Sequence, residues 1–137
     1  MRVDFTQEMV FGFSGPNLSL LGNEGDFKKM AQVIIDLTVP NPNSIEITSL
    51  DFVQNTGDII KVLFRSQPNG EKFGIFSESH VLVFELDDRY WERIFKFFVL
   101  MSWDKKTYYL NSFEDCLRDL PLDQECHLIC SSEFGKE

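Results

Sequence analysis

The segment that most constrains the fold is Tyr90–Trp103, YWERIFKFFVLMSW, in which ten of fourteen residues are aromatic or aliphatic. A membrane-spanning helix needs about 20 consecutive apolar residues, whereas the longest run without a charge here is the seven residues from Phe97 to Trp103. At about 100° per residue, the apolar side chains fill an arc of roughly 200° on a helix, and Glu92, Arg93 and Lys96 gather opposite. The pattern therefore predicts a core helix that lies deep against a sheet.

Two apolar residues of this segment do not fit the buried arc. Leu100 and Trp103 fall on the charged side of the helix, near Arg93 and Lys96. Either the helix ends near Val99, or another element covers that side, or the two residues are exposed. We expect one of the first two alternatives. If the two residues are exposed, a tryptophan beside a leucine is the kind of anchor that protein interfaces favour.

A second helix is predicted over residues 23–38. Asn23 is a suitable N-cap, and Glu24 and Asp26 favour the positive end of the helix dipole. The apolar residues recur every three or four positions and form one stripe: Phe27, Met30, Ala31, Ile34 and Leu37. Pro40 and Pro42 end this helix, because proline cannot continue the hydrogen-bond ladder.

Alternating or short apolar runs predict the strands, at residues 3–13, 17–22, 44–53, 59–67, 72–76, 80–86, 107–111 and 126–134. The run at 80–86 is apolar on both faces and suggests a central strand. Residues 112–120 suggest a short C-terminal helix, capped by Ser112 and ended by Pro121. We expect one α+β domain over residues 1–137. It would contain a mixed, mostly antiparallel sheet of about six or seven strands, with the two main helices packed on it.

Asn69-Gly70 lies between two of the predicted strands and indicates a tight turn. A type I′ turn needs positive φ at both central residues, which Asn-Gly provides. We therefore predict that the strands on either side of this turn pair as a β-hairpin.

A similar pattern occurs twice along the chain, at residues 17–35 and 80–98. Each copy has a short apolar strand, an acidic cap region and a helix with an aromatic residue in its early turns. An internal duplication and two ordinary strand–helix units both explain it, and we favour the second explanation.

The charge is strongly acidic, with 22 acidic and 13 basic residues and a net charge of −9. Such a surface repels nucleic acid and anionic lipid, whose phosphates need lysine and arginine. It attracts a basic protein and speeds the encounter with it. Solubility alone explains the acidity equally well; as the functional interpretation, we expect a protein partner of basic character, with no nucleic-acid or membrane partner.

The acidity is concentrated near the C-terminus, where residues 114–137 hold seven acids and two bases. Two interpretations stand side by side, a solvated acidic face and a docking surface for a basic partner. The candidate docking residues in this region are Glu114, Asp115, Asp119, Asp123 and Glu125.

Cys116, Cys126 and Cys130 form an odd set, and Asp4 and Glu8 are unlike a signal peptide, so we expect free thiols in the cytoplasm. Zinc is disfavoured, because positions 126 and 130 of a straight strand lie about 13 Å apart. The chain has no nucleophile motif and no glycine-rich phosphate loop. We expect neither cofactor nor catalysis.

The segment NLSLLGNEGDFKKMAQVIIDL followed by SIEITSL resembles the strand–helix–strand opening of several bacterial immunity proteins, which accompany polymorphic and contact-dependent toxins. The resemblance covers about the first 65 residues. It implies a protein that binds a cognate toxin, often a nuclease, and blocks it stoichiometrically. The alternatives are a small adaptor or structural domain and, less favoured, an enzyme with a site built from distant residues.

Overall fold

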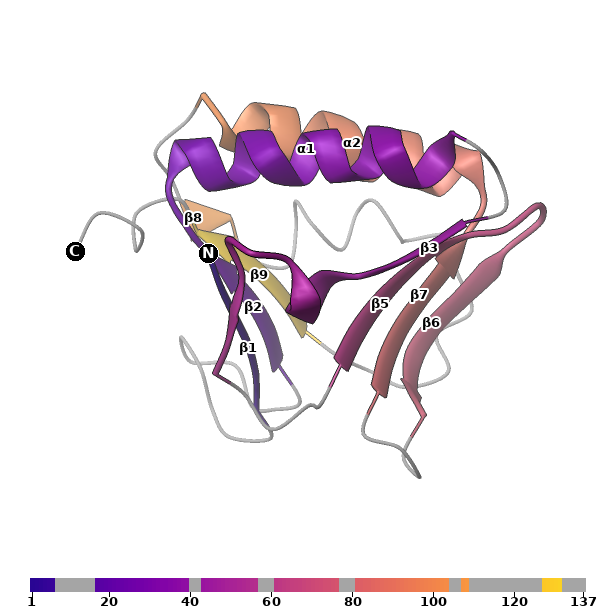
Figure 1. The fold of residues 1–137 in the computed structure, drawn as a ribbon, viewed down its shortest axis with the longest axis horizontal. Helices are drawn as coiled ribbons and strands as arrows, with labels where there is room; N and C mark the ends of the chain where they lie inside the picture. The colour runs from indigo at the N-terminus through magenta and orange to yellow at the C-terminus, as the bar shows by residue number, and fades with distance from the viewer. Residues whose placement is uncertain are drawn as a thin grey trace.

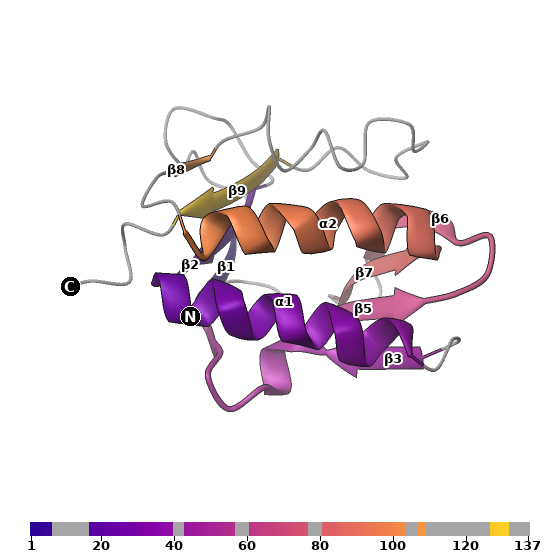
Figure 2. The same ribbon diagram turned by 90° about the horizontal axis from the view of Figure 1, so that it is seen from above.

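The computed structural model describes residues 1–6, 17–39, 43–56, 61–76, 81–103, 107–108 and 127–131. Two helices, α1 (Glu24–Thr38) and α2 (Asp88–Met101), lie side by side in one layer above two separate sheets (Figure 1). The helices are antiparallel, since α1 begins over the first sheet and α2 begins over the second (Figure 2). The α+β class is confirmed.

The first sheet has the strand order β4-β1-β2-β9-β8. Its members are β1 (Arg2–Thr6), β2 (Asn17–Leu21), β4 (Gln54–Asn55), β8 (Thr107–Tyr108) and β9 (His127–Ser131). The β1–β2 and β8–β9 pairs are antiparallel, and β1–β4 and β2–β9 are parallel. The central strand β2 leads directly into α1.

The second sheet has the order β3-β5-β7-β6. Its members are β3 (Asn43–Glu46), β5 (Lys61–Ser66), β6 (Glu71–Phe76) and β7 (Val81–Leu86). The β5–β7 pair is parallel, and β3–β5 and β6–β7 are antiparallel. The prediction of a central strand at residues 80–86 is confirmed for residues 81–86, which pair with β5 on one side and β6 on the other. This strand leads directly into α2.

The prediction of one sheet with six or seven strands is wrong, because the strands divide into two sheets. The division falls inside the run 44–53, which we expected to be one strand. The chain leaves β3 at Glu46, makes a single 3-10 turn at Ile47–Ser49 and enters β4 in the other sheet. Ile47 is fully buried within this turn, so its apolar character reflects the core rather than a continuing strand. The short helix predicted at 112–120 lies outside the described residues.

The turn at Asn69 is present, but the predicted hairpin is wrong. Asn69 has φ of 59°, and the Gly70 N–H donates to the Gln67 carbonyl at 2.9 Å. This hydrogen bond closes a turn over residues 67–70 with Pro68 and Asn69 at its centre. The φ near −65° that Pro68 imposes there fits a type II turn, not the predicted type I′ turn centred on Asn69 and Gly70. Strands β5 and β6 do not pair, because β7 lies between them.

The turn closes over the end of β7 instead. The Gln67 N–H donates to the Leu86 carbonyl, and the Asp87 N–H donates to the Gly70 carbonyl. A Cβ on Gly70 would lie 2.9 Å from the Glu85 carbonyl oxygen, so glycine is required by the close backbone approach.

The core lies between the helix layer and the two sheets. One cluster of buried apolar residues takes members from both sheets and both helices. Within this cluster, the Trp91 indole N–H donates to the carbonyl oxygens of Arg65 and Leu86, both at 3.0 Å. The Trp91 ring also packs on Phe64, with 4.9 Å between centroids. Trp91 therefore fixes α2 onto the ends of β5 and β7.

The prediction that the aromatic segment is a core helix is confirmed, and Asp87 is its N-cap. Six of its residues are buried: Tyr90, Trp91, Ile94, Phe97, Phe98 and Met101. The buried arc is narrower than predicted, since Phe95 is half-buried and Val99 is exposed. Contact with α1 also fixes the position of this helix, where the Phe27 and Phe98 ring centroids are 6.1 Å apart.

Candidate protein-binding surface

Large apolar side chains are exposed on the helix layer. Within the part of the chain that the structure describes, five such residues are exposed: Ile35, Val39, Val99, Leu100 and Trp103. All belong to α1, α2 or the residues just after these helices. We therefore take the helix layer as the candidate interaction surface.

Leu100 and Trp103 are exposed, contrary to both alternatives that we expected. The helix does not end near Val99, because α2 continues to Met101. Among the described residues, no element covers this side enough to bury it, since Leu100 is 45% exposed and Trp103 is 82% exposed. The Trp103 N–H donates to the Leu100 carbonyl at 3.1 Å, so the chain keeps a helical turn up to the tryptophan. The two residues therefore lie close together at the end of α2.

A groove of about 320 Å³ lies between the C-terminal half of α1 and the N-terminal half of α2. Buried Ile34 and Trp91 contribute to its lining. Ile35, Val39 and Phe95 add apolar surface that is exposed or half-exposed. Sequence reasoning missed this groove, because it exists only where two helices far apart in the chain lie side by side.

The groove has an acidic edge on the α2 side. Asp88 and Glu92 line it, and among the described residues that line the groove none is basic. Glu92 pairs with Lys96 at 3.1 Å, but both side chains are about two-thirds exposed or more, so solvent weakens this pair. Asp88 accepts a long hydrogen bond of 3.5 Å from the Ser66 hydroxyl.

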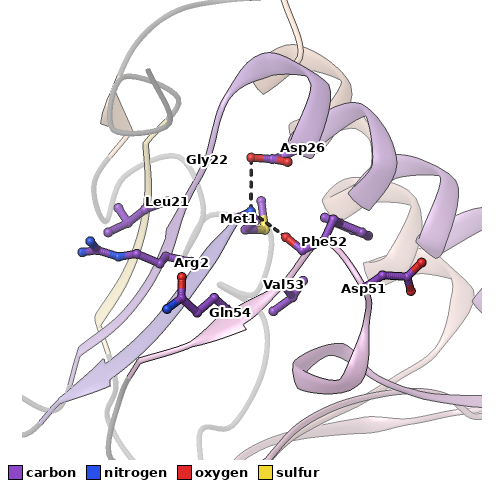
Figure 3. A pocket seen from close by; sticks show the side chains of 9 residues that line it. All are labelled: Met1, Arg2, Leu21, Gly22, Asp26, Asp51, Phe52, Val53 and Gln54. Carbon is purple, nitrogen blue, oxygen red and sulfur yellow. Dashed lines mark hydrogen bonds and ion pairs between the residues drawn. The ribbon is translucent and has the colours of Figure 1, made fainter. Parts of the chain in front are cut away.

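A second hollow of about 320 Å³ surrounds Met1 at the edge of the first sheet (Figure 3). The Met1 ammonium donates to the Phe52 carbonyl at 2.6 Å and pairs with Asp26 at 3.3 Å. In Figure 3 these contacts meet at the ammonium, while Arg2 and Asp51 point away from it. The Met1 ammonium therefore links β1 to the segment before β4 and to the start of α1.

The five acidic candidates, Glu114, Asp115, Asp119, Asp123 and Glu125, lie outside the described residues. The described residues hold nine basic and eleven acidic side chains, which gives them a net charge of −2. The other seven negative charges of the chain's −9 therefore belong to the remaining residues. The described framework is close to neutral, so local charges decide what each part of its surface attracts.

Neither a metal cluster nor a membrane helix is found in the described part of the chain. No three His, Cys, Asp or Glu side chains gather there as metal ligands would. No helix there has the length and apolar character to cross a bilayer. Cys116 and Cys126 lie outside the described residues.

Comparison of the chain with models of known families, with curated proteins and with solved structures finds no match in any of the three. The resemblance to immunity proteins thus remains an expectation from the sequence.

Proposed function

We propose that the protein is an immunity protein, which binds a cognate bacterial toxin domain and neutralises it by stoichiometric protein–protein inhibition. The observation that carries this proposal is the exposed tryptophan at the end of α2, with Trp103 82% exposed beside the exposed Leu100. Binding, rather than catalysis, is the function that such a surface serves.

The energetics of an exposed tryptophan support an anchor role. Tryptophan is among the residues that dominate binding energy when they become buried at the centre of an interface. Burying a large apolar side chain gains about 1.5–3 kcal/mol relative to leaving it in water. In the free protein Trp103 does not obtain this gain, which makes it available to a partner.

The acidic residues complement this anchor. Most of the net −9 charge belongs to residues beyond the near-neutral framework, including Glu114, Asp115, Asp119, Asp123 and Glu125. In the proposed complex they steer a basic toxin, such as a nuclease, towards the surface. Binding is then fast and sensitive to salt, because steering by exposed charges is screened by ions.

The test is protection of bacterial cells from the proposed cognate toxin domain, which is to be sought in the genes beside that of this chain. We expect cells that produce both proteins to grow, and cells that produce the toxin with the Trp103→Asp variant to stop growing. Lys61→Ala is the matched control, because Lys61 is exposed on β5, away from the helix layer. Failure of the unchanged protein to protect cells contradicts the proposal and favours an adaptor domain with another partner.

A further inference from the structure

We infer that Asn69 is a site of deamidation, a covalent modification whose rate is controlled by local opening of the turn at the end of β7. Asn69-Gly70 is the one Asn-Gly pair in the sequence. Asparagine is a thermolabile residue, and it reacts most readily before glycine, which has no Cβ to hinder the attacking nitrogen. The inference is independent of the proposed function, because it concerns this turn and not the helix layer.

The reaction needs only the protein and water. The Gly70 backbone nitrogen loses its proton and attacks the side-chain amide carbon of Asn69. A bond forms between these two atoms, the bond from that carbon to the amide nitrogen breaks, and the lost proton leaves with the departing ammonia. Water then adds to one of the two carbonyl carbons of the resulting succinimide ring and opens it. One opening gives aspartate, and the other gives isoaspartate, in which the backbone runs through the side chain.

Only one of the two reacting groups is accessible in the closed turn. The Asn69 side chain is exposed, whereas Gly70 is buried and its N–H donates to the Gln67 carbonyl at 2.9 Å. The nitrogen attacks only after it loses its proton, so it must first give up this hydrogen bond. The negative nitrogen would then face the Gln67 carbonyl oxygen, which repels it. The closed turn therefore holds back the reaction.

The backbone around Gly70 is also held in place. The Asp87 N–H donates to the Gly70 carbonyl at 2.9 Å, and the Gln67 N–H donates to the Leu86 carbonyl at 3.0 Å. A Cβ on Gly70 would lie no more than 3.0 Å from each of three surrounding backbone atoms. The peptide unit between Asn69 and Gly70 has little room to turn towards the Asn69 side chain. Reaction therefore requires the turn to lift from the end of β7.

Such an opening is local and does not need the core to unfold. Residues 67–69 are exposed, and none of the buried core side chains belongs to the turn 67–70. Opening thus breaks a few backbone hydrogen bonds and exposes little apolar surface. Segments of this kind open at a lower free energy than the whole protein.

The two products have different effects on the structure. Aspartate leaves the backbone unchanged and tolerates the left-handed conformation, as asparagine does, so it keeps the turn. Isoaspartate lengthens the backbone just before Gly70, where the surrounding atoms leave no space. We expect this product to lose the hydrogen bond from the Asp87 N–H to Gly70. Because Asp87 is the N-cap of α2, the modification loosens the start of that helix.

The experiment compares the deamidation rate of the intact protein with that of the synthetic peptide Ser66–Lys72, the fragment that trypsin releases. Both are incubated near neutral pH in ¹⁸O water and then digested in ordinary water, so that the heavy oxygen marks only the reaction during incubation. Mass spectrometry measures the product. We expect the intact protein to react about 10-fold to 1,000-fold more slowly than the peptide, because only the open turn reacts.

The variant Pro68→Ala tests the control by the turn. Proline pre-sets the backbone of the turn, so its removal makes opening easier. We expect the rate in the protein to rise about twofold to fivefold, while the peptide with the same substitution keeps its rate. Lys61→Ala is the control, since Lys61 is exposed at the other end of β5, and it leaves the rate in the protein unchanged.

Amide spectra of the ¹⁵N-labelled protein test the effect of the products. We expect Asn69→Asp, which imitates the aspartate product, to keep the amide signals of Gly70 and Asp87 close to those of the unchanged protein. Protein enriched in isoaspartate by chromatography is expected to shift both signals and to have a lower urea midpoint.

Several outcomes overturn the inference. Equal rates in the protein and the peptide do so, and so does an unchanged rate in the Pro68→Ala protein. A slowing beyond about 10,000-fold also does so, because the reaction then requires unfolding of the whole protein. Unshifted Gly70 and Asp87 signals in the isoaspartate form overturn the link from the modification to the start of α2.

Discussion

The two strand–helix units, β2–α1 and β7–α2, share a topology but hold their helices by different means. In each unit the central strand has an antiparallel neighbour that precedes it in the chain, β1 or β6, and a parallel neighbour on its other side. An Asx residue then caps the helix, Asn23 in the first unit and Asp87 in the second. The shared topology accounts for the repeated sequence pattern without requiring a common origin.

The first unit has a reciprocal capping box at its helix start. Asn23 and Asp26 form a capping box in which each side chain accepts from the other's backbone N–H. Asp26 also binds the Met1 ammonium. In the second unit the cap is simpler, with Asp87 accepting from the Arg89 N–H. The buried Trp91, with its two hydrogen bonds and its contact on Phe64, anchors that helix.

The difference predicts which substitutions are most harmful. The largest effect is expected for Trp91→Ala, which removes a fully buried ring and leaves one buried and one part-buried carbonyl group without this donor. We expect the free energy of unfolding to fall by about 3–5 kcal/mol. Urea denaturation followed by circular dichroism measures it. A loss below about 1 kcal/mol contradicts the anchoring role of Trp91.

Two glycines near the starts of the helices provide the next comparison. Gly70→Ala places a Cβ against backbone atoms at the end of β7, so we expect a loss of about 1–3 kcal/mol. Gly25→Ala lies in the first turn of α1, where the nearest atom is the Asn23 side chain at 3.3 Å. This variant is expected to be neutral or to gain up to about 1 kcal/mol. Similar urea midpoints for the Gly70→Ala and Gly25→Ala variants would contradict the close packing of Gly70.

The smaller effect comes from the caps. Asn23→Ala and Asp87→Ala each remove an N-cap oxygen, and we expect each to lower stability by about 0.5–2 kcal/mol. Asn23→Ala is expected to cost more, because it also breaks the capping box. Thermal denaturation of the two variants ranks them. A larger loss for Asp87→Ala shows that the difference between the units is not at their caps.

The local structure of both units was predictable from sequence, because its causes are local. The Asx caps, the apolar stripes and the prolines after Val39 fix helix positions through neighbouring residues alone. Strand pairing depends on distant residues. Nothing near Asn69 indicates that β7, formed later in the chain, separates the two strands beside the turn. Alternation likewise gave no sign that residues 44–53 pass from one sheet to the other.

The candidate surface was predictable only in part. Leu100 and Trp103 stood out, because they are apolar residues on a charged helix face. Their exposure could not be predicted, because the angular positions of residues on a helix show neither where the helix ends nor which other element packs against it. The groove at Ile35, Val39 and Phe95 required the relative position of α1 and α2, which comes from tertiary packing. The five acidic candidates remain predictions.

The contrast between Trp91 and Trp103 gives the most direct test of whether Trp103 is a binding anchor. The measurement is the affinity of the Trp103→Ala variant for the cognate toxin domain of the proposed function, made together with its urea midpoint. We predict that the free energy of unfolding of this variant lies within about 0.5 kcal/mol of that of the unchanged protein, as for an exposed residue. We also predict that the variant binds the toxin domain at least about 30-fold more weakly. An unchanged affinity together with a clearly lower urea midpoint contradicts the anchor role of Trp103, because Trp103 would then belong to the core, as Trp91 does.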